Sequence, residues 1–145
     1  MSRPEQLPQL RFAVLTLFPE MFDAITHWGV TGRAFQAGLW DLHLQDPRDE
    51  AADRHGSVDD RPYGGGPGMV MQAPILASSL AKARQAVGEQ AKVVAMSPQG
   101  LKLDAALVTS LARHSEFVLV GGRYAGIDER FIHHSVDLEI SVGDF

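Results

Sequence analysis

The last third of the chain alternates short apolar runs with helical patterns, and this alternation restricts the fold more than any other feature. Apolar runs rich in β-branched residues predict strands, and the segments between them carry apolar residues at helical spacing. The expected order is strand 92–96, helix 104–113, strand 116–120, helix 128–134 and strand 136–141. Strands that alternate with helices form parallel sheets covered by helices on both faces. The predicted fold class is therefore α/β with a mostly parallel sheet.

The first half of the chain adds two strands and three helices to this pattern. The run LRFAVLTL is almost entirely apolar, which is typical of a central strand buried on both faces. Proline suits a first helical turn, glycine suits the end of a helix, and Thr31 can cap a second short helix. The expected elements are a strand over 10–17, helices over 19–29, 31–37 and 73–87, and a strand over 40–45.

Length and composition predict one compact domain over residues 10–145, preceded by a loose tail over residues 1–9. The sequence shows no run of about 20 apolar residues and no signal peptide. It has no cysteine, which fits a reducing compartment, so a cytoplasmic location is expected. The net charge is −5, from 13 Lys and Arg against 18 Asp and Glu. That sign disfavours nucleic-acid binding over the whole surface, so any RNA contact must be local, and a domain that binds only a small ligand is an alternative.

A long segment without periodicity separates the two halves of the chain. Residues 46–68 (DPRDEAADRHGSVDDRPYGGGPG) consist mainly of charged residues, proline and glycine. A loop this long in a compact domain more often binds a ligand or covers a site than merely connects two elements, with disorder as the alternative. Composition alone does not decide between the two.

Small and turn-forming residues follow each of the last three strands. The three segments are 97–100 (SPQG), 121–126 (GGRYAG) and 142–145 (VGDF). The carboxyl ends of parallel strands lie at the same edge of a sheet, so these loops can converge on one crevice. Glycines there let backbone groups approach a flat ligand closely. One glycine after a strand is usually only a turn, but three such loops in series predict a ligand site.

The residues argue against several common sites. Residues 17–20, between the first strand and its helix, hold no glycine, whereas a dinucleotide site requires a glycine-rich turn there. The run GGGPG at 64–68 lacks the Gly-Lys-Ser/Thr ending of a phosphate-binding loop. The histidines are scattered, and Asp59, Asp60 and Arg61 are typical of a solvated turn. No metal site is therefore expected from the residues themselves.

Six longer motifs occur in a fixed order between residues 10 and 145. They are LFPEMF (17–22), GVTGRA (29–34), VDDRPYGGGPGMVM (58–71), SPQG (97–100), GGRYAGIDER (121–130) and VGDF (142–145). Together they resemble the bacterial TrmD family of tRNA (guanine-N1)-methyltransferases, of the SPOUT class. The resemblance implies a fold with a deep trefoil knot and a homodimer. It also implies transfer of the methyl group of S-adenosyl-L-methionine (AdoMet) to N1 of guanosine 37, just 3′ of the anticodon in tRNA.

The resemblance also implies roles for individual residues. The loops after the last three strands correspond to the AdoMet-binding loops of the family, which agrees with the crevice predicted from strand order. The implied AdoMet-binding residues are Ser97, Pro98, Gln99, Gly100, Gly122, Tyr124, Gly126, Val142, Gly143, Asp144 and Phe145. The implied guanine-binding residues, in the long loop, are Arg61, Tyr63, Pro67 and Gly68. Mg²⁺ is a further cofactor that the resemblance suggests.

The chain departs from the family pattern at two places. Ala125 stands where family members commonly have a glutamate linked to the reacting guanine and to divalent-metal dependence. The aspartate base of the family lies in a segment beyond Phe145, as do the knot-closing helix and the C-terminal tRNA-binding domain. We therefore expect an incomplete knot, no catalytic residue within residues 1–145 and no activity of this segment alone. The alternative function is a non-catalytic AdoMet-binding or dimerisation module.

Overall fold

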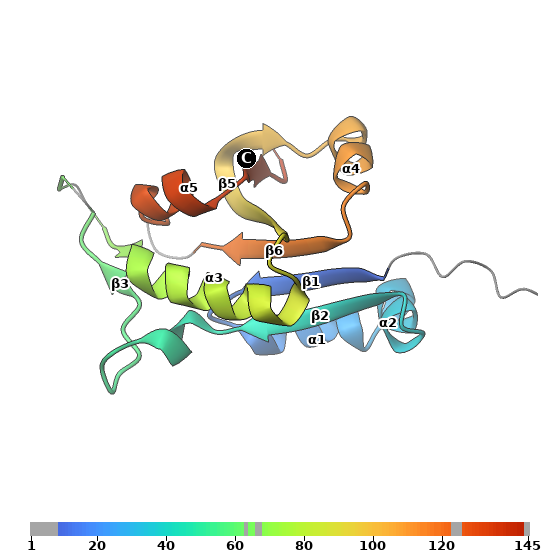
Figure 1. Cartoon of the computed structure of the whole chain (residues 1–145), viewed down its shortest axis with the longest axis horizontal. Coiled ribbons are helices and arrows are strands. Elements are labelled where there is room, and N and C mark those ends of the chain that lie inside the picture. The colour runs from blue at the N-terminus through green and yellow to red at the C-terminus, as the bar shows by residue number, and fades with distance from the viewer. Residues whose placement is uncertain (1–8, 63, 66–67, 123–125, 144–145) are drawn as a thin grey trace, which may run out of the picture.

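A five-stranded parallel sheet forms the centre of the computed structural model (Figure 1), which describes residues 9–62, 64–65, 68–122 and 126–143. Every neighbouring pair of strands in it runs parallel, so the connections cross over the sheet. In spatial order the strands are β2 (Trp40–Gln45), β1 (Leu10–Leu15), β6 (Glu116–Gly121), β5 (Lys92–Lys102) and β7 (Leu138–Ser141). The predicted α/β class with a mostly parallel sheet is confirmed.

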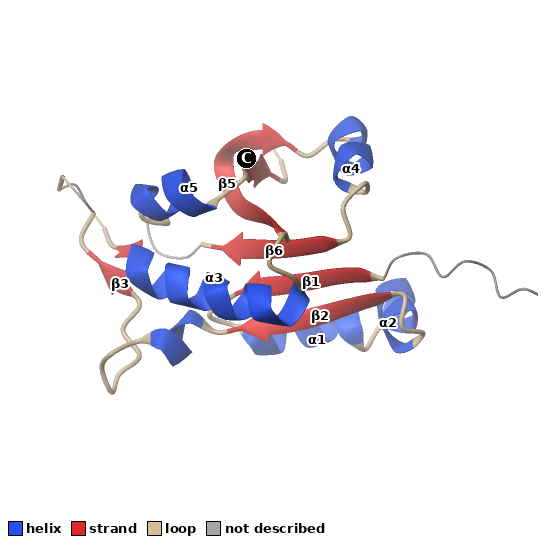
Figure 2. Ribbon diagram, viewed as in Figure 1, coloured by secondary structure: helices blue, strands red, loops and turns tan. Residues whose placement is uncertain are grey.

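Helices cover both faces of this sheet (Figure 2). They are the 3-10 helix η1 (Pro19–Phe22) and the α-helices α1 (Asp23–Thr26), α2 (Gly29–Gln36), α3 (Ala73–Val87), α4 (Ala105–Leu111) and α5 (Glu129–Ser135). Successive strand residues point to opposite faces. Val93 of β5 accordingly packs in a core with residues of α3 and α5, whereas its neighbour Val94 packs in a second cluster beside Leu107 of α4. No helix among the described residues is long and apolar enough to cross a membrane.

The larger core lies between α3 and the sheet. Helix α3 begins and ends at the predicted residues, 73 and 87, because its apolar side chains recur at helical spacing. Its buried apolar residues are Ile75, Leu76, Leu80, Ala83 and Val87. Arg11 of β1 donates a hydrogen bond to the carbonyl of Ala86 at 2.5 Å. This places a cation at the negative end of the α3 dipole and ties the helix to the central strand.

The turn between α1 and α2 differs from the prediction. Thr31 was expected to cap the second helix, but α2 begins at Gly29 and its N-cap residue is Trp28, which has extended backbone. The cause is a close crossing of the two helices: a Cβ atom on Gly32 would lie 2.8 Å from the backbone carbonyl carbon of His27. Glycine at this position lets α2 fold back against the end of α1, so the second helix starts two residues earlier than its capping pattern indicates.

Part of the long loop over 46–68 is regular. It contains the 3-10 helix η2 (Pro47–Glu50), and β3 (Asp59–Asp60) pairs antiparallel with β4 (Val70–Met71). The Asp46 carboxylate accepts a hydrogen bond from the backbone N–H of Arg48 at 2.9 Å, and the Arg48 guanidinium donates to the carbonyl of Leu17 at 2.7 Å. The start of the loop is therefore fixed to the segment after β1, which composition alone could not predict.

Candidate functional site

Residues 97–100 form a bulge inside β5. Met96 and Leu101 both register with Ile140 of β7, so the residues between them have no partner of their own on that strand. The sequence predicts a strand that ends at Met96, but β5 continues to Lys102. The prediction of a loop after the strand is wrong in this respect, because pairing with the distant strand β7 restores extended backbone beyond the bulge. Such bulges re-aim side chains and occur often beside functional sites.

Gly100 lies directly against the backbone of β7. A Cβ atom on Gly100 would lie 2.5 Å from the carbonyl carbon of Glu139 and 2.5 Å from the backbone nitrogen of Ile140. Neither atom can rotate away, because both belong to a paired strand. At Gly122, by contrast, a Cβ atom would meet only the side chain of Ile127, at 3.2 Å. The bulge therefore requires glycine at position 100 more strictly than the loop after β6 requires it at position 122.

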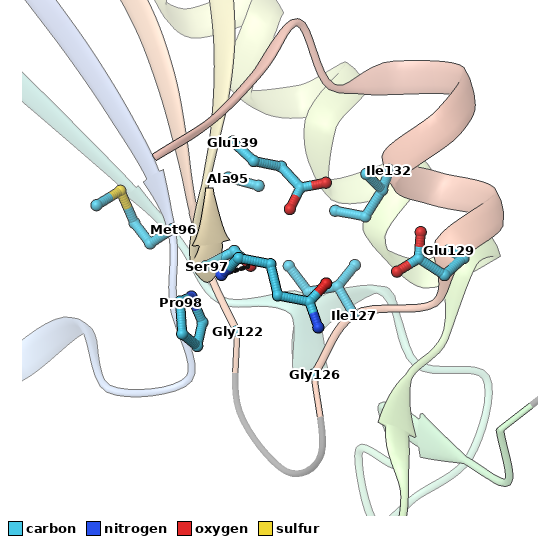
Figure 3. A pocket seen from close by; sticks show the side chains of 11 residues that line it. Ala95, Met96, Ser97, Pro98, Gly122, Gly126, Ile127, Glu129, Ile132 and Glu139 are labelled. Atoms are coloured by element: carbon cyan, nitrogen blue, oxygen red, sulfur yellow. Dashed lines mark hydrogen bonds between the residues drawn. The ribbon is translucent and has the colours of Figure 1, made fainter. Parts of the chain in front are cut away.

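A cavity of about 320 Å³ opens beside this bulge (Figure 3). Its walls come from the bulge of β5, the segment after β6, the strand β7 and the helix α5. The lining residues are Ala95, Met96, Ser97, Pro98, Gln99, Gly122, Gly126, Ile127, Glu129, Ile132 and Glu139. The structure thus brings the predicted residues Ser97, Pro98, Gln99, Gly122 and Gly126 together around one space.

The other predicted cofactor residues lie around this cavity or outside the described residues. Gly100 lines an adjoining open groove between α5 and β7, and Val142 and Gly143 line a hollow of about 190 Å³. Ser97 and Pro98 line both that hollow and the cavity beside the bulge, so they form the wall between the two. The predicted residues outside the described part of the chain are Tyr124, Asp144 and Phe145.

Strand β4 joins the long loop to the cavity. The backbone N–H of Met71 donates to the carbonyl of Gly126 at 3.0 Å, and the N–H of Asp128 donates to the carbonyl of Met71 at 3.1 Å. Met71 is buried in the larger core, so core packing holds the segment that makes these two hydrogen bonds. Of the predicted guanine-binding residues, Arg61 and Gly68 are exposed on the loop, whereas Tyr63 and Pro67 lie outside the described residues.

Asp128 fixes the start of α5 beside the cavity. Its side chain is 5% exposed and pairs with the Arg130 guanidinium at 2.6 Å. The same carboxylate accepts a hydrogen bond from the backbone N–H of Arg130 at 2.9 Å, which makes Asp128 the N-cap of the helix. The side-chain hydrogen bond from Arg130 holds the pKa of Asp128 below its ordinary value, although burial acts in the opposite direction.

Asp128→Asn is expected to lower the free energy of unfolding by about 1 kcal/mol near pH 7, and by much less near pH 3. A pKa depressed in the folded state contributes stability above the ordinary aspartate pKa of about 3.9, and this contribution is lost as the pH falls through the folded-state value. Asparagine keeps an acceptor for the helix N-terminus, so the substitution isolates the charge. Urea denaturation at a series of pH values measures the effect, and a constant difference between the two proteins at every pH would contradict it.

Sequence reasoning missed the two carboxylates that line the cavity. Glu129 lies in the first turn of α5, and Glu139 lies in β7 between the apolar residues Leu138 and Ile140. A charged residue between the apolar residues of a short strand was the available signal for Glu139. The described residues contain no group of three or more histidine or carboxylate side chains placed to hold a metal ion.

Comparisons with known proteins agree with this geometry. A family model described as tRNA (Guanine-1)-methyltransferase TrmD matches residues 10–145. A tRNA (guanine-N(1)-)-methyltransferase of Shewanella oneidensis is 59% identical over 132 residues, which cover 91% of this chain and 53% of that protein. A protein of the same name from Shewanella putrefaciens is 58% identical over the same shares of both chains. The chain therefore spans about half the length of the curated relatives it matches.

A solved structure supports the same relationship at the level of the fold. The crystal structure of tRNA (m1G37) methyltransferase from Aquifex aeolicus matches with a TM-score of 0.83 and 36% sequence identity. The match covers 94% of this chain and 61% of that one.

Proposed function

This chain belongs to the tRNA (guanine-1)-methyltransferase TrmD family, and we propose that the intact protein transfers the methyl group of AdoMet to N1 of guanosine 37 in tRNA. The observation that carries the proposal is the cavity between the β5 bulge, the segment after β6 and α5. It gathers five of the residues that the family resemblance assigns to AdoMet, namely Ser97, Pro98, Gln99, Gly122 and Gly126.

The cavity suits AdoMet in size and in chemistry. Small-molecule sites typically measure about 300–1,000 Å³ and present few side-chain polar groups among apolar ones. This cavity measures about 320 Å³. Its lining combines the bulge, Gly122 and Gly126 with apolar side chains such as Ile127 and Ile132. Backbone N–H and C=O groups bare of side chains can hydrogen-bond the edge of an adenine ring. We assign Gly100, Val142 and Gly143 to the same site, together with Tyr124, Asp144 and Phe145.

The chemistry divides between the methyl donor and the protein. AdoMet, when bound, supplies an electrophilic methyl group on a positively charged sulfur. The residues of this chain hold and orient it, since the bulge of β5 and the capped helix α5 form walls of its site. Guanine N1 carries a proton that a general base must accept as the new N–C bond forms. We assign neither that base nor a ligand of Mg²⁺ to the described residues.

The long loop is proposed to hold the guanine, through Arg61, Tyr63, Pro67 and Gly68. Support comes from strand β4, which follows this loop and hydrogen-bonds to Gly126 and Asp128 beside the cavity. A nucleobase on the loop would then lie close to a methyl donor in the cavity. The net charge of −5 agrees with a local RNA contact, with tRNA as the partner, and not with a wholly basic surface.

We further propose that the protein is a homodimer of the SPOUT class in the cytoplasm. Several large apolar side chains on and beside α1 and α2 are exposed; we call this set the α1–α2 apolar face. It consists of Met21, Ile25, Trp28, Val30 and Leu39. Trp28 is 72% exposed and Val30 is 73% exposed, which is unusual for two large neighbouring residues on a solvated surface. A second copy of the chain is the proposed occupant of this face.

The direct test of the function is methyl transfer by the intact protein. Incubation with methyl-labelled AdoMet and tRNA that carries an unmodified guanosine 37 is expected to label that nucleoside at N1. Transcripts with adenosine at position 37 should stay unlabelled. Binding of AdoMet without any transfer would favour a non-catalytic binding module instead.

A further inference from the structure

The cavity beside the β5 bulge is lined by two carboxylate side chains. Among the described residues that line it, only Glu129 and Glu139 are ionisable, and they come from different elements. Figure 3 shows the Glu139 side chain directed toward Ile132, with Glu129 at the far side on α5. Within the described part of the chain, no hydrogen bond or ion pair joins either carboxylate to another residue.

The placement of Glu139 follows from the register of the sheet. Glu139 is paired with Ala95 of β5, which is fully buried and too small to fill the space above it. Ile140, its neighbour in β7, points to the opposite face and packs in the cluster beside α4. The carboxylate of Glu139 is therefore directed to the α5 side of the sheet, where it is half-buried.

A half-buried carboxylate without a cationic partner is costly, because burial removes part of its hydration. The cost is offset when a cation occupies the adjoining space. Edge strands do use inward charges to prevent aggregation, but that purpose does not require the charge to line a ligand cavity. Glu129 is more exposed, so solvent screens its field more strongly.

We propose that Glu139 is a specificity-determining residue that holds the positively charged sulfonium of the methyl donor. This inference rests on the proposed function. The amino-acid end of AdoMet pairs an ammonium with a carboxylate, so the sulfonium is the unbalanced charge. That charge disappears when the methyl group leaves, because the C–S bonding electrons stay on sulfur and give the neutral thioether S-adenosylhomocysteine. Glu139 thus favours the donor over the product and helps to release the product.

Calorimetric titration of the intact protein and its Glu139→Gln variant tests the proposal. AdoMet is expected to bind the variant about tenfold more weakly, a change of about 1.4 kcal/mol. S-adenosylhomocysteine should bind both proteins within about twofold of each other. Sinefungin, which carries an amine in place of the sulfonium, should follow AdoMet. Glu89→Gln, which neutralises an exposed carboxylate outside the cavity, is the control and should change no affinity by more than about twofold.

The outcomes separate this inference from the proposed function. If the parent protein does not bind AdoMet, the proposed function fails. If the parent binds AdoMet but Glu139→Gln weakens all three ligands equally, or none of them, Glu139 does not recognise the sulfonium, and the proposed function stands. An unfolding temperature of the variant equal to that of the parent shows that the fold is intact, as expected for an isosteric change.

Discussion

Gly100→Ala is expected to weaken AdoMet binding by about 100-fold, whereas Gln99→Ala should weaken it by less than about tenfold. The added Cβ would lie 2.5 Å from backbone atoms of Glu139 and Ile140, so β5 and β7 must separate at the bulge. The bulge forms one wall of the cavity, and its displacement changes the shape of the whole site. Truncation of Gln99 removes at most one hydrogen bond, about 0.5–1.5 kcal/mol. Isothermal titration with AdoMet compares the two variants.

The fold should survive the change at Gly100. The pairing of β5 with β6 involves residues 92–96 and ends before the bulge. The larger core includes Val93 and Ala95 of that paired segment but none of residues 97–100. The unfolding temperature is therefore expected to fall only moderately, because overpacking lowers the free energy of unfolding by about 1–3 kcal/mol. Undiminished AdoMet affinity of Gly100→Ala would show that the bulge does not form the site.

The parts of the fold that follow from local patterns could be predicted from the sequence. Helix α3 has its predicted bounds because a long apolar stripe and a terminal glycine act within the helix itself. The parallel sheet follows from the alternation of strands and helices. The start of α2 could not be predicted, because a contact between Gly32 and the backbone of His27 decides it. Capping residues in the sequence do not reveal a contact between two helices.

The candidate site was predictable to a similar extent. The glycine-containing segments indicated which strand ends would meet, and Ser97, Gln99 and Gly122 do lie around one cavity. The continuation of β5 past the bulge depends on pairing with Ile140, about 40 residues away in the chain. Glu139 was missed for a related reason: only the register of β7 against β5 shows which face its side chain occupies.

Trp28→Asp is expected to convert a dimer of the intact protein into a monomer, with a dissociation constant raised roughly 1,000-fold. Trp28 is 72% exposed in the single chain and lies at the centre of the sequence that forms the α1–α2 apolar face. A two-fold axis through this face would bury Trp28 of both subunits, so one substitution removes two tryptophans and buries two carboxylates. Sedimentation equilibrium over a range of concentrations measures the change.

Leu101→Asp is the matched control for this experiment. Leu101 is also exposed, at 60%, but it lies on β5 beyond the bulge. Strand β5 is next to the sheet edge opposite β2. A dimer that forms through α1 and α2 should tolerate a charge there, whereas a dimer that forms through the β5–β7 edge should not. Both substitutions affect exposed side chains, so neither should change the circular dichroism spectrum of the folded chain. A monomeric Leu101→Asp protein together with a dimeric Trp28→Asp protein would move the interface to the cavity side of the sheet.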